Sequence, residues 1–246
     1  MGLFKSSQEK KAEKANELYQ RGRQAMDNNR IFEAINSFEQ AIVIMDEIGE
    51  RRGEFATRYN LGSIYIQAEN FQQARDHLVK ALDLAKALGI QQEQIHINFM
   101  IGRSMRFSGN AAGALPYLEE SARLCRQLND AESLPSVLNN LGLAYRHTHN
   151  PGKARLTYEE ALQLPGMSAN IGMKGAVHNN LAMTYLDMGD LEKAKMHLGA
   201  ALPLRQNVGD MQGVAETLQN LVEVHTQAGD SMQAAHYAGQ LKSMFG

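Results

Sequence analysis

The chain has 246 residues, of which 43% are hydrophobic, and its formal net charge is −2. A charge so near zero gives no field that would recruit nucleic acid or an anionic membrane, and no apolar run is long enough to span a bilayer. Cys125 is the single cysteine, so no disulfide can form within the chain, which agrees with a reducing, cytoplasmic setting.

Residues 1–14 are expected to form an N-terminal extension ahead of one domain that covers residues 15–246. The extension lacks the apolar stretch of a secretory signal. Met1, Gly2 and Ser6 match the pattern for N-myristoylation, but the pattern is short and leaves the modification open.

From about residue 15 onward, the sequence repeats itself with a period of about 40 residues. One column of the repeat is alanine without exception: Ala34, Ala74, Ala114, Ala154, Ala194 and Ala234. A second column holds small residues in five of its six copies: Gly22, Gly62, Gly102, Gly142 and Ala182. A third column is Asn or Asp: Asn70, Asn110, Asn150, Asp190 and Asp230. Such recurrence predicts stacked copies of one supersecondary unit.

Each column has a mechanical role. Gly109, Gly189 and Gly229 stand directly before the Asn or Asp column, which predicts a helix end followed by a capped helix start. The small residues let two helices approach closely, and the apolar spacing between the caps is helical. The sequence therefore predicts an all-α protein of six helical hairpins, with no sheet.

These residues resemble the tetratricopeptide repeat. The family pattern of the first helix appears as Leu61-Gly62-Tyr65, Leu141-Gly142-Tyr145 and Leu181-Ala182-Tyr185, and that of the second helix as Ala74-Leu78-Ala81. The resemblance runs from about Ala15 to Phe245 and is closest to the longer-repeat branch found in kinesin light chains, spindle-orientation adaptors and bacterial peptide receptors. It implies a right-handed α-solenoid that acts as a non-catalytic interaction scaffold.

Some positions depart from the pattern. In the first repeat, Arg21 replaces a large apolar residue and Ala25 replaces the aromatic one. Pro116 is expected to delay or kink the second helix of the third repeat. The stretch LPGMSANIG, residues 164–172, is expected to shorten the second helix of the fourth repeat and lengthen the connection that follows.

Motifs for catalysis are absent from the sequence: it has no HExxH, P-loop, GxSxG or glycine-rich dinucleotide turn. His147 and His149 are too isolated for a metal site, His77 and His197 are expected to pack within hairpins, and Cys125 is expected to be buried and inert. We therefore expect no enzyme activity, no metal and no cofactor.

The resemblance implies that the first helix of each hairpin lines a concave groove for an extended peptide. It assigns peptide-backbone binding to one asparagine column: Asn60, Asn140, Asn180 and Asn220. The residue before each of these adds Tyr59, Asn139 and Asn179 to the predicted groove. A carboxamide offers donors and an acceptor, which suits a peptide backbone, but it suits a neighbouring helix equally well. Both interpretations stay open.

Arg103, Arg106 and Arg146 lie further along the same predicted face, with Arg106 and Arg146 at equivalent positions of adjacent repeats. Side-by-side guanidinium groups favour carboxylates, so we expect a ligand with an acidic segment. The face turns acidic toward the C-terminus at Asp187, Glu216 and Glu223.

The sequence thus predicts a scaffold or adaptor that binds a protein or peptide partner. Two alternatives remain: a regulatory sensor for a short signalling peptide, and a self-assembling structural protein. Self-association is expected through the last helix, where Leu241, Met244 and Phe245 lie near the C-terminus without a polar capping helix.

Overall fold

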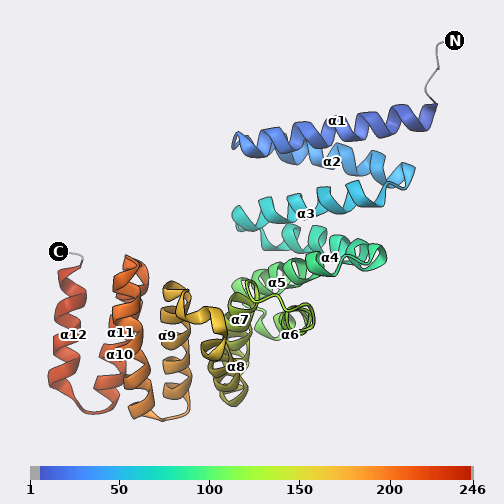
Figure 1. The fold of residues 1–246 in the computed structure, drawn as a ribbon. Coiled ribbons are helices and arrows are strands. Elements are labelled where there is room, and N and C mark those ends of the chain that lie inside the picture. The colour runs from blue at the N-terminus through green and yellow to red at the C-terminus, as the bar shows by residue number, and fades with distance from the viewer. Residues whose placement is uncertain (1–5, 245–246) are drawn as a thin grey trace. The chain divides into compact units, whose positions relative to one another are not determined.

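The computed structural model describes residues 6–244 and confirms the all-α prediction (Figure 1). The described residues form twelve α-helices and no strand. The first helices of the six hairpins are α1 (Ser7–Asp27), α3 (Arg51–Gln67), α5 (Gln91–Phe107), α7 (Leu134–His147), α9 (Ile171–Asp187) and α11 (Met211–Gln227). The second helices are α2 (Ile31–Ile48), α4 (Phe71–Leu88), α6 (Ala111–Leu128), α8 (Pro151–Gln163), α10 (Leu191–Asn207) and α12 (Ser231–Ser243).

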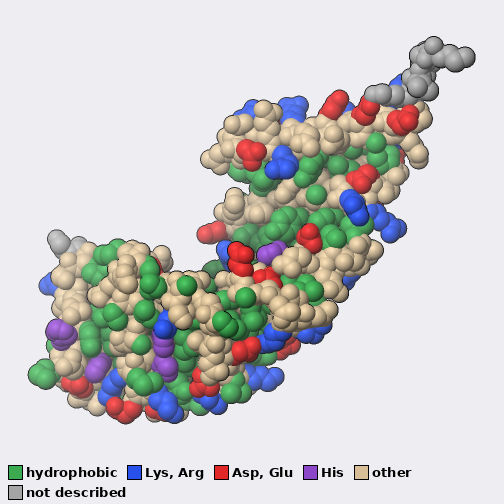
Figure 2. All heavy atoms as spheres, in the orientation of Figure 1, with side chains coloured by type: hydrophobic (Ala, Val, Ile, Leu, Met, Phe, Trp, Pro, Cys, Tyr) green, Lys and Arg blue, Asp and Glu red, His purple; other side chains and the backbone are tan. Residues whose placement is uncertain are grey.

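The chain divides into two compact units, residues 1–124 and 125–246, with the boundary inside α6. Within each unit, helices pack against their neighbours in sequence, as in α1 with α2, α3 with α4, and α9 with α10. Apolar side chains occupy the seams between the helices, as Figure 2 shows for each unit. Burial of this continuous apolar surface is what stabilises hairpins that could not fold alone.

The turns between helices contain the predicted glycine helix ends and the predicted Asn or Asp helix caps. Six glycines adopt a left-handed backbone at helix ends: Gly49, Gly89, Gly109, Gly189, Gly209 and Gly229. Asn70, Asn110, Asp190 and Asp230 then cap the next helix by accepting a backbone N–H three residues on. The prediction from the Gly-Asn and Gly-Asp pairs is confirmed, although Asn150 makes no such side-chain bond ahead of Pro151.

The glycine column allows the close approach of the two helices in the first four hairpins. A Cβ at Gly62 would lie 2.5 Å from the Leu78 side chain, and one at Gly142 would lie 2.5 Å from the Tyr158 ring. Gly22 and Gly102 meet Phe38 and Leu118 in the same way. The small residue of the first helix and the large residue of the second therefore pack directly against each other in these hairpins.

Two helix starts differ from what the sequence suggested. Helix α1 begins at Ser7, within the predicted extension of residues 1–14, because Ser6 and Glu9 form a reciprocal capping box. The domain boundary at residue 15 stays a prediction. Pro116 does not delay α6, which begins at Ala111 and continues through it. In contrast, α8 does end early, at Gln163, and a short 3₁₀ helix, η1 (Pro165–Ser168), occupies the longer connection to α9 as expected.

The N-myristoylation pattern includes Met1 and Gly2, which lie outside the described residues. The self-association expected at the last helix involves Phe245, which also lies outside them, and Leu241 and Met244, which are half-buried. Within residues 6–244, every helix is too short or too polar to cross a bilayer.

Candidate functional site

The asparagines of the predicted groove join the first helices of unit 2 to one another. The Asn180 amide donates to Asn139 Oδ1 across 2.9 Å, and the Asn220 amide donates to Asn179 Oδ1 across 3.0 Å. Asn140 donates to a carbonyl of its own helix, Ser136 O, at 3.0 Å. The sequence left two uses open for these asparagines: binding a peptide, or joining neighbouring helices. The contacts are of the second kind for four of them: Asn139, Asn179, Asn180 and Asn220.

Asn179 is the centre of a buried polar network and is only 1% exposed. Its amide donates to Glu216 Oε1 at 3.1 Å, and its oxygen also accepts from Thr217 Oγ1 at 3.2 Å. Arg205, which is buried as well, donates from α10 to Glu216 Oε2 at 3.0 Å. These bonds hold α9, α10 and α11 together, and they leave Asn179 no open surface toward a ligand.

In unit 1, the predicted groove residues make fewer hydrogen bonds to neighbouring helices than those of unit 2. Tyr59 and Asn60 are half-buried on α3, and the Tyr59 ring lies 6.4 Å from that of Phe55. Burial raises the pKa of Tyr59, and the nearby Glu93 carboxylate adds to the effect. Asn60 makes no side-chain hydrogen bond to any described residue, so its carboxamide is available to a ligand.

The arginines divide between the units. Arg103 and Arg106 belong to unit 1, where their guanidinium carbons lie 5.7 and 4.3 Å from the centre of the Phe107 ring. Phe107 is 54% exposed and stacks on Phe71 with 5.9 Å between ring centres. Sequence reasoning missed Phe107, although an aromatic residue one turn after Arg103 on an exposed helix face is a recognisable signal.

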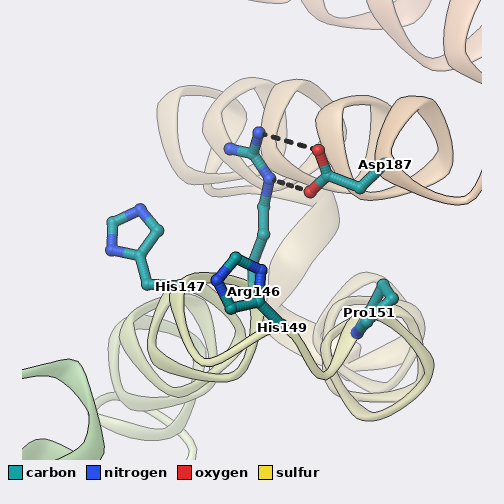
Figure 3. Close-up of a pocket in the computed structure, with 5 residues that line it drawn as sticks. All are labelled: Arg146, His147, His149, Pro151 and Asp187. Atoms are coloured by element: carbon teal, nitrogen blue, oxygen red, sulfur yellow. Dashed lines mark hydrogen bonds and ion pairs between the residues drawn. The ribbon is translucent and has the colours of Figure 1, made fainter.

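Arg146 belongs to unit 2 and has a partner there. Its Nε lies 2.5 Å from Asp187 Oδ2, so the arginine of α7 is paired with the carboxylate that ends α9 (Figure 3). This ion pair lowers the positive charge that Arg146 was expected to present. The adjacency of Arg106 and Arg146 stays a prediction.

The ion pair forms one wall of an open hollow of about 630 Å³, lined by Arg146, His147, His149, Pro151 and Asp187. The His147 ring projects to the side, away from the ion pair (Figure 3). In residues 6–244, no three His, Cys, Asp or Glu side chains are grouped so that they could hold a metal ion.

A second polar cluster lies inside unit 2, between α8, α9 and α10. Tyr185 donates to Glu159 Oε1 at 2.9 Å, and the same carboxylate accepts two bonds from Arg155. The Tyr185 ring stacks on His197 with 5.5 Å between ring centres, and the Nδ1 atoms of His178 and His197 are 2.9 Å apart. Burial lowers the pKa of His178 to about 4, with a smaller contribution from His197.

Cys125 gives no sign of nucleophilic chemistry. Its side chain is fully buried, and burial raises the pKa of the thiol to about 11, with Asp130 adding to the rise. A thiol in this state is inert at neutral pH.

The sequence model of the tetratricopeptide repeat matches residues 13–87, 94–165 and 174–244, which together cover most of the chain. The chain belongs to the tetratricopeptide repeat family. The family is one of interaction modules and is generally non-catalytic. No curated protein matches the sequence.

Solved tetratricopeptide repeat structures of similar fold share little sequence with this chain. BtubC (BKLC) from P. vanneervenii is 18% identical with a TM-score of 0.68, over 98% of this chain and 91% of its own. The apo form of RapI is 11% identical with a TM-score of 0.72, over 94% and 97%. PilF of Pseudomonas aeruginosa is 17% identical with a TM-score of 0.63, over 96% and 93%. At these identities the likeness extends to the fold alone.

Proposed function

We propose that this protein is a non-catalytic adaptor that binds an extended segment of a partner protein along the first helices of its repeats. We call these predicted groove residues the first-helix face: Tyr59, Asn60, Asn140, Asn180, Asn220, Arg103, Arg106 and Arg146, with Asn139 and Asn179 behind them. The fold supports a binding role because the stacked hairpins of each unit place equivalent positions of successive repeats along one surface of that unit. The proposal includes the cytoplasmic setting that the single cysteine favours.

The observation that carries the proposal is the free carboxamide of Asn60 beside the half-buried ring of Tyr59. The carboxamide makes no hydrogen bond to the described residues, so a ligand can use its donors and its acceptor without breaking an internal bond. An extended peptide would supply a backbone N–H and C=O to the carboxamide and an apolar side chain to the ring.

The acidic character of the ligand belongs to the same proposal. Arg103 is exposed on α5 and has no carboxylate partner among the described residues. Its guanidinium group packs on Phe107 and leaves N–H donors for a ligand. An acidic partner segment would gain one screened ion pair here, worth about 1 kcal/mol or less and falling with salt.

A display library of random peptides, panned against the purified protein, tests the proposal. Enriched peptides should bind through the first-helix face, so the change Asn60→Arg should weaken their binding at least about tenfold. Asn36→Arg places the same side chain on an exposed position of α2, outside this face, and serves as the matched control. Enriched peptides that bind both variants as tightly as the native protein would reject the proposal.

A further inference from the structure

A set of four interacting residues in unit 2 has equivalent positions in unit 1, but two of the four residue types are missing there. In unit 2, Arg155 and Glu159 on α8 and Tyr185 on α9 form a linked set, with the Tyr185 hydroxyl donating to Glu159 and the ring stacked on His197. The tyrosine ring thereby fills the seam between α8 and α10, and the carboxylate satisfies both the arginine and the phenol.

Two repeats earlier, the same four positions are Arg75, Val79, Met105 and Tyr117. The arginine is kept and an aromatic residue stands in place of His197, but the carboxylate and the tyrosine are missing. Their replacements are shorter and apolar, so they can neither fill the seam nor pair with the arginine. A Tyr65 that stacks on His77 at 5.6 Å shows that unit 1 uses the filled arrangement elsewhere.

The structure has a hollow of about 520 Å³ at this place, lined by residues of α4 and α6 with α5 as its floor. We call it the α4–α6 hollow. Its lining combines apolar and polar side chains: Ile101, Met105, Val79, Tyr117, Gln72, Arg75, Asp76 and Lys80. Ile101 is fully buried and Val79 is 37% exposed, so the floor is closed and the mouth is open.

Arg75 stands at the rim of the α4–α6 hollow in a fixed position. Its two terminal nitrogens donate to Ser108 Oγ at 3.1 Å and Gln72 Oε1 at 2.6 Å, and it has no carboxylate partner among the described residues. Lys80 is a second cation of the lining without an ion-pair partner in the described chain. Asp76, the acidic residue of the lining, accepts a hydrogen bond from Gln72. The rim is therefore net positive above an apolar floor.

We propose that the α4–α6 hollow is a docking site for a partner segment that carries an aromatic side chain next to a carboxylate. The incoming ring takes the place of the missing tyrosine and stacks on Tyr117, as Tyr185 stacks on His197. The carboxylate takes the place of the missing glutamate and pairs with Arg75, as Glu159 pairs with Arg155. The hollow uses none of the residues of the first-helix face, so this proposal stands or falls separately.

Methyl NMR titration with short blocked peptides tests the proposal. The probe is acetyl-Glu-Phe-Glu-amide, and the matched probes are acetyl-Gln-Phe-Gln-amide, which lacks the charge, and acetyl-Glu-Ala-Glu-amide, which lacks the ring. The first should cause saturable shifts at the methyl groups of Val79, Ile101 and Met105, with a dissociation constant at least about tenfold lower than either matched probe gives. Equal responses to all three probes, or no saturable shift, would overturn the proposal.

Two protein variants locate the binding. Val79→Glu combined with Met105→Tyr restores the set found in unit 2, so it should fold as the native protein does and lose binding of the probe. Arg75→Gln should reduce the affinity for acetyl-Glu-Phe-Glu-amide to that for its uncharged counterpart, whereas Arg23→Gln, at an exposed arginine of α1, should leave it unchanged. Undiminished binding to the double variant overturns the proposal. Should that variant fail to fold, unchanged affinity in Arg75→Gln would overturn it equally.

Discussion

Gly142 faces the ring of Tyr158, which is completely buried. The pairing is one case of a complementary pattern, in which a small residue on the first helix meets a large one on the second. At the last hairpin the sizes are exchanged, with Val222 in the small column and Ala238 in the large one. The exchange puts the larger residue on the first helix and the smaller one on the second, an alternative way to fill the same position of the hairpin.

The change Gly142→Ala should lower the free energy of unfolding by about 1–3 kcal/mol, because the added methyl overpacks the contact with Tyr158. Urea denaturation of both proteins measures the difference. Gly152→Ala is the control, since a Cβ at that helical position has no neighbour within 4 Å. That control should be neutral or slightly stabilising, and equal destabilisation by both changes would show that the close contact is not the cause.

His178 and His197 make the stability of the α9–α10 hairpin sensitive to acid. Burial is the main cause that lowers the pKa of both, to about 4 for His178, whereas an unfolded histidine titrates near 6.5. Below about pH 6.5 the unfolded chain binds more protons than the folded one, so the free energy of unfolding falls as the pH drops toward 4.

The change His178→Gln should remove part of this loss. The pair is half-exposed, so solvent screening reduces the effect, and we expect the difference in stability between pH 7.5 and pH 5 to shrink by about 1 kcal/mol. Urea denaturation at both pH values measures it. His236, an exposed histidine of α12, gives the control variant His236→Gln. The same pH dependence in all three proteins would rule out the histidine pair as its source.

At the scale of helices, three polar contacts between successive first helices of unit 2 share the same sequence separation. The contacts Asn139 with Asn180, Asn179 with Asn220, and Arg146 with Asp187 each join residues 41 positions apart. At these three contacts, a residue of one first helix meets the residue one position further along in the following repeat. Pairs of polar residues at this separation are a sequence signal for inter-repeat contacts.

The buried Asn179 should contribute more to this stacking than the half-buried Asn180. Asn179→Ala removes one hydrogen bond from each of Thr217, Glu216 and Asn220, and we expect a loss of about 1–3 kcal/mol in the free energy of unfolding. Asn180→Ala removes one bond to Asn139 and should cost about 0.5–1.5 kcal/mol. Thermal and urea unfolding measure both. A larger loss for Asn180→Ala would contradict the network.

For the whole molecule, the repeat period, the hairpins and most of their caps could be predicted from the sequence, because glycine, alanine and Asn or Asp each meet a steric or capping demand that recurs in most copies. The uses of the asparagines could not be predicted, since a carboxamide serves a peptide and a neighbouring helix equally. The pairing of Arg146 with Asp187 and the α4–α6 hollow depend on contacts between repeats, which local sequence patterns do not specify.

The central claim is that the first helices of the repeats bind an extended partner segment. Hydrogen exchange of the protein, with and without a peptide enriched by display, tests it most directly because binding slows the opening of the helices contacted. We predict added protection in α3, α5, α7, α9 and α11, with Asn60→Arg abolishing the protection in α3. Protection confined to the second helices α4, α8, α10 and α12 would contradict the claim.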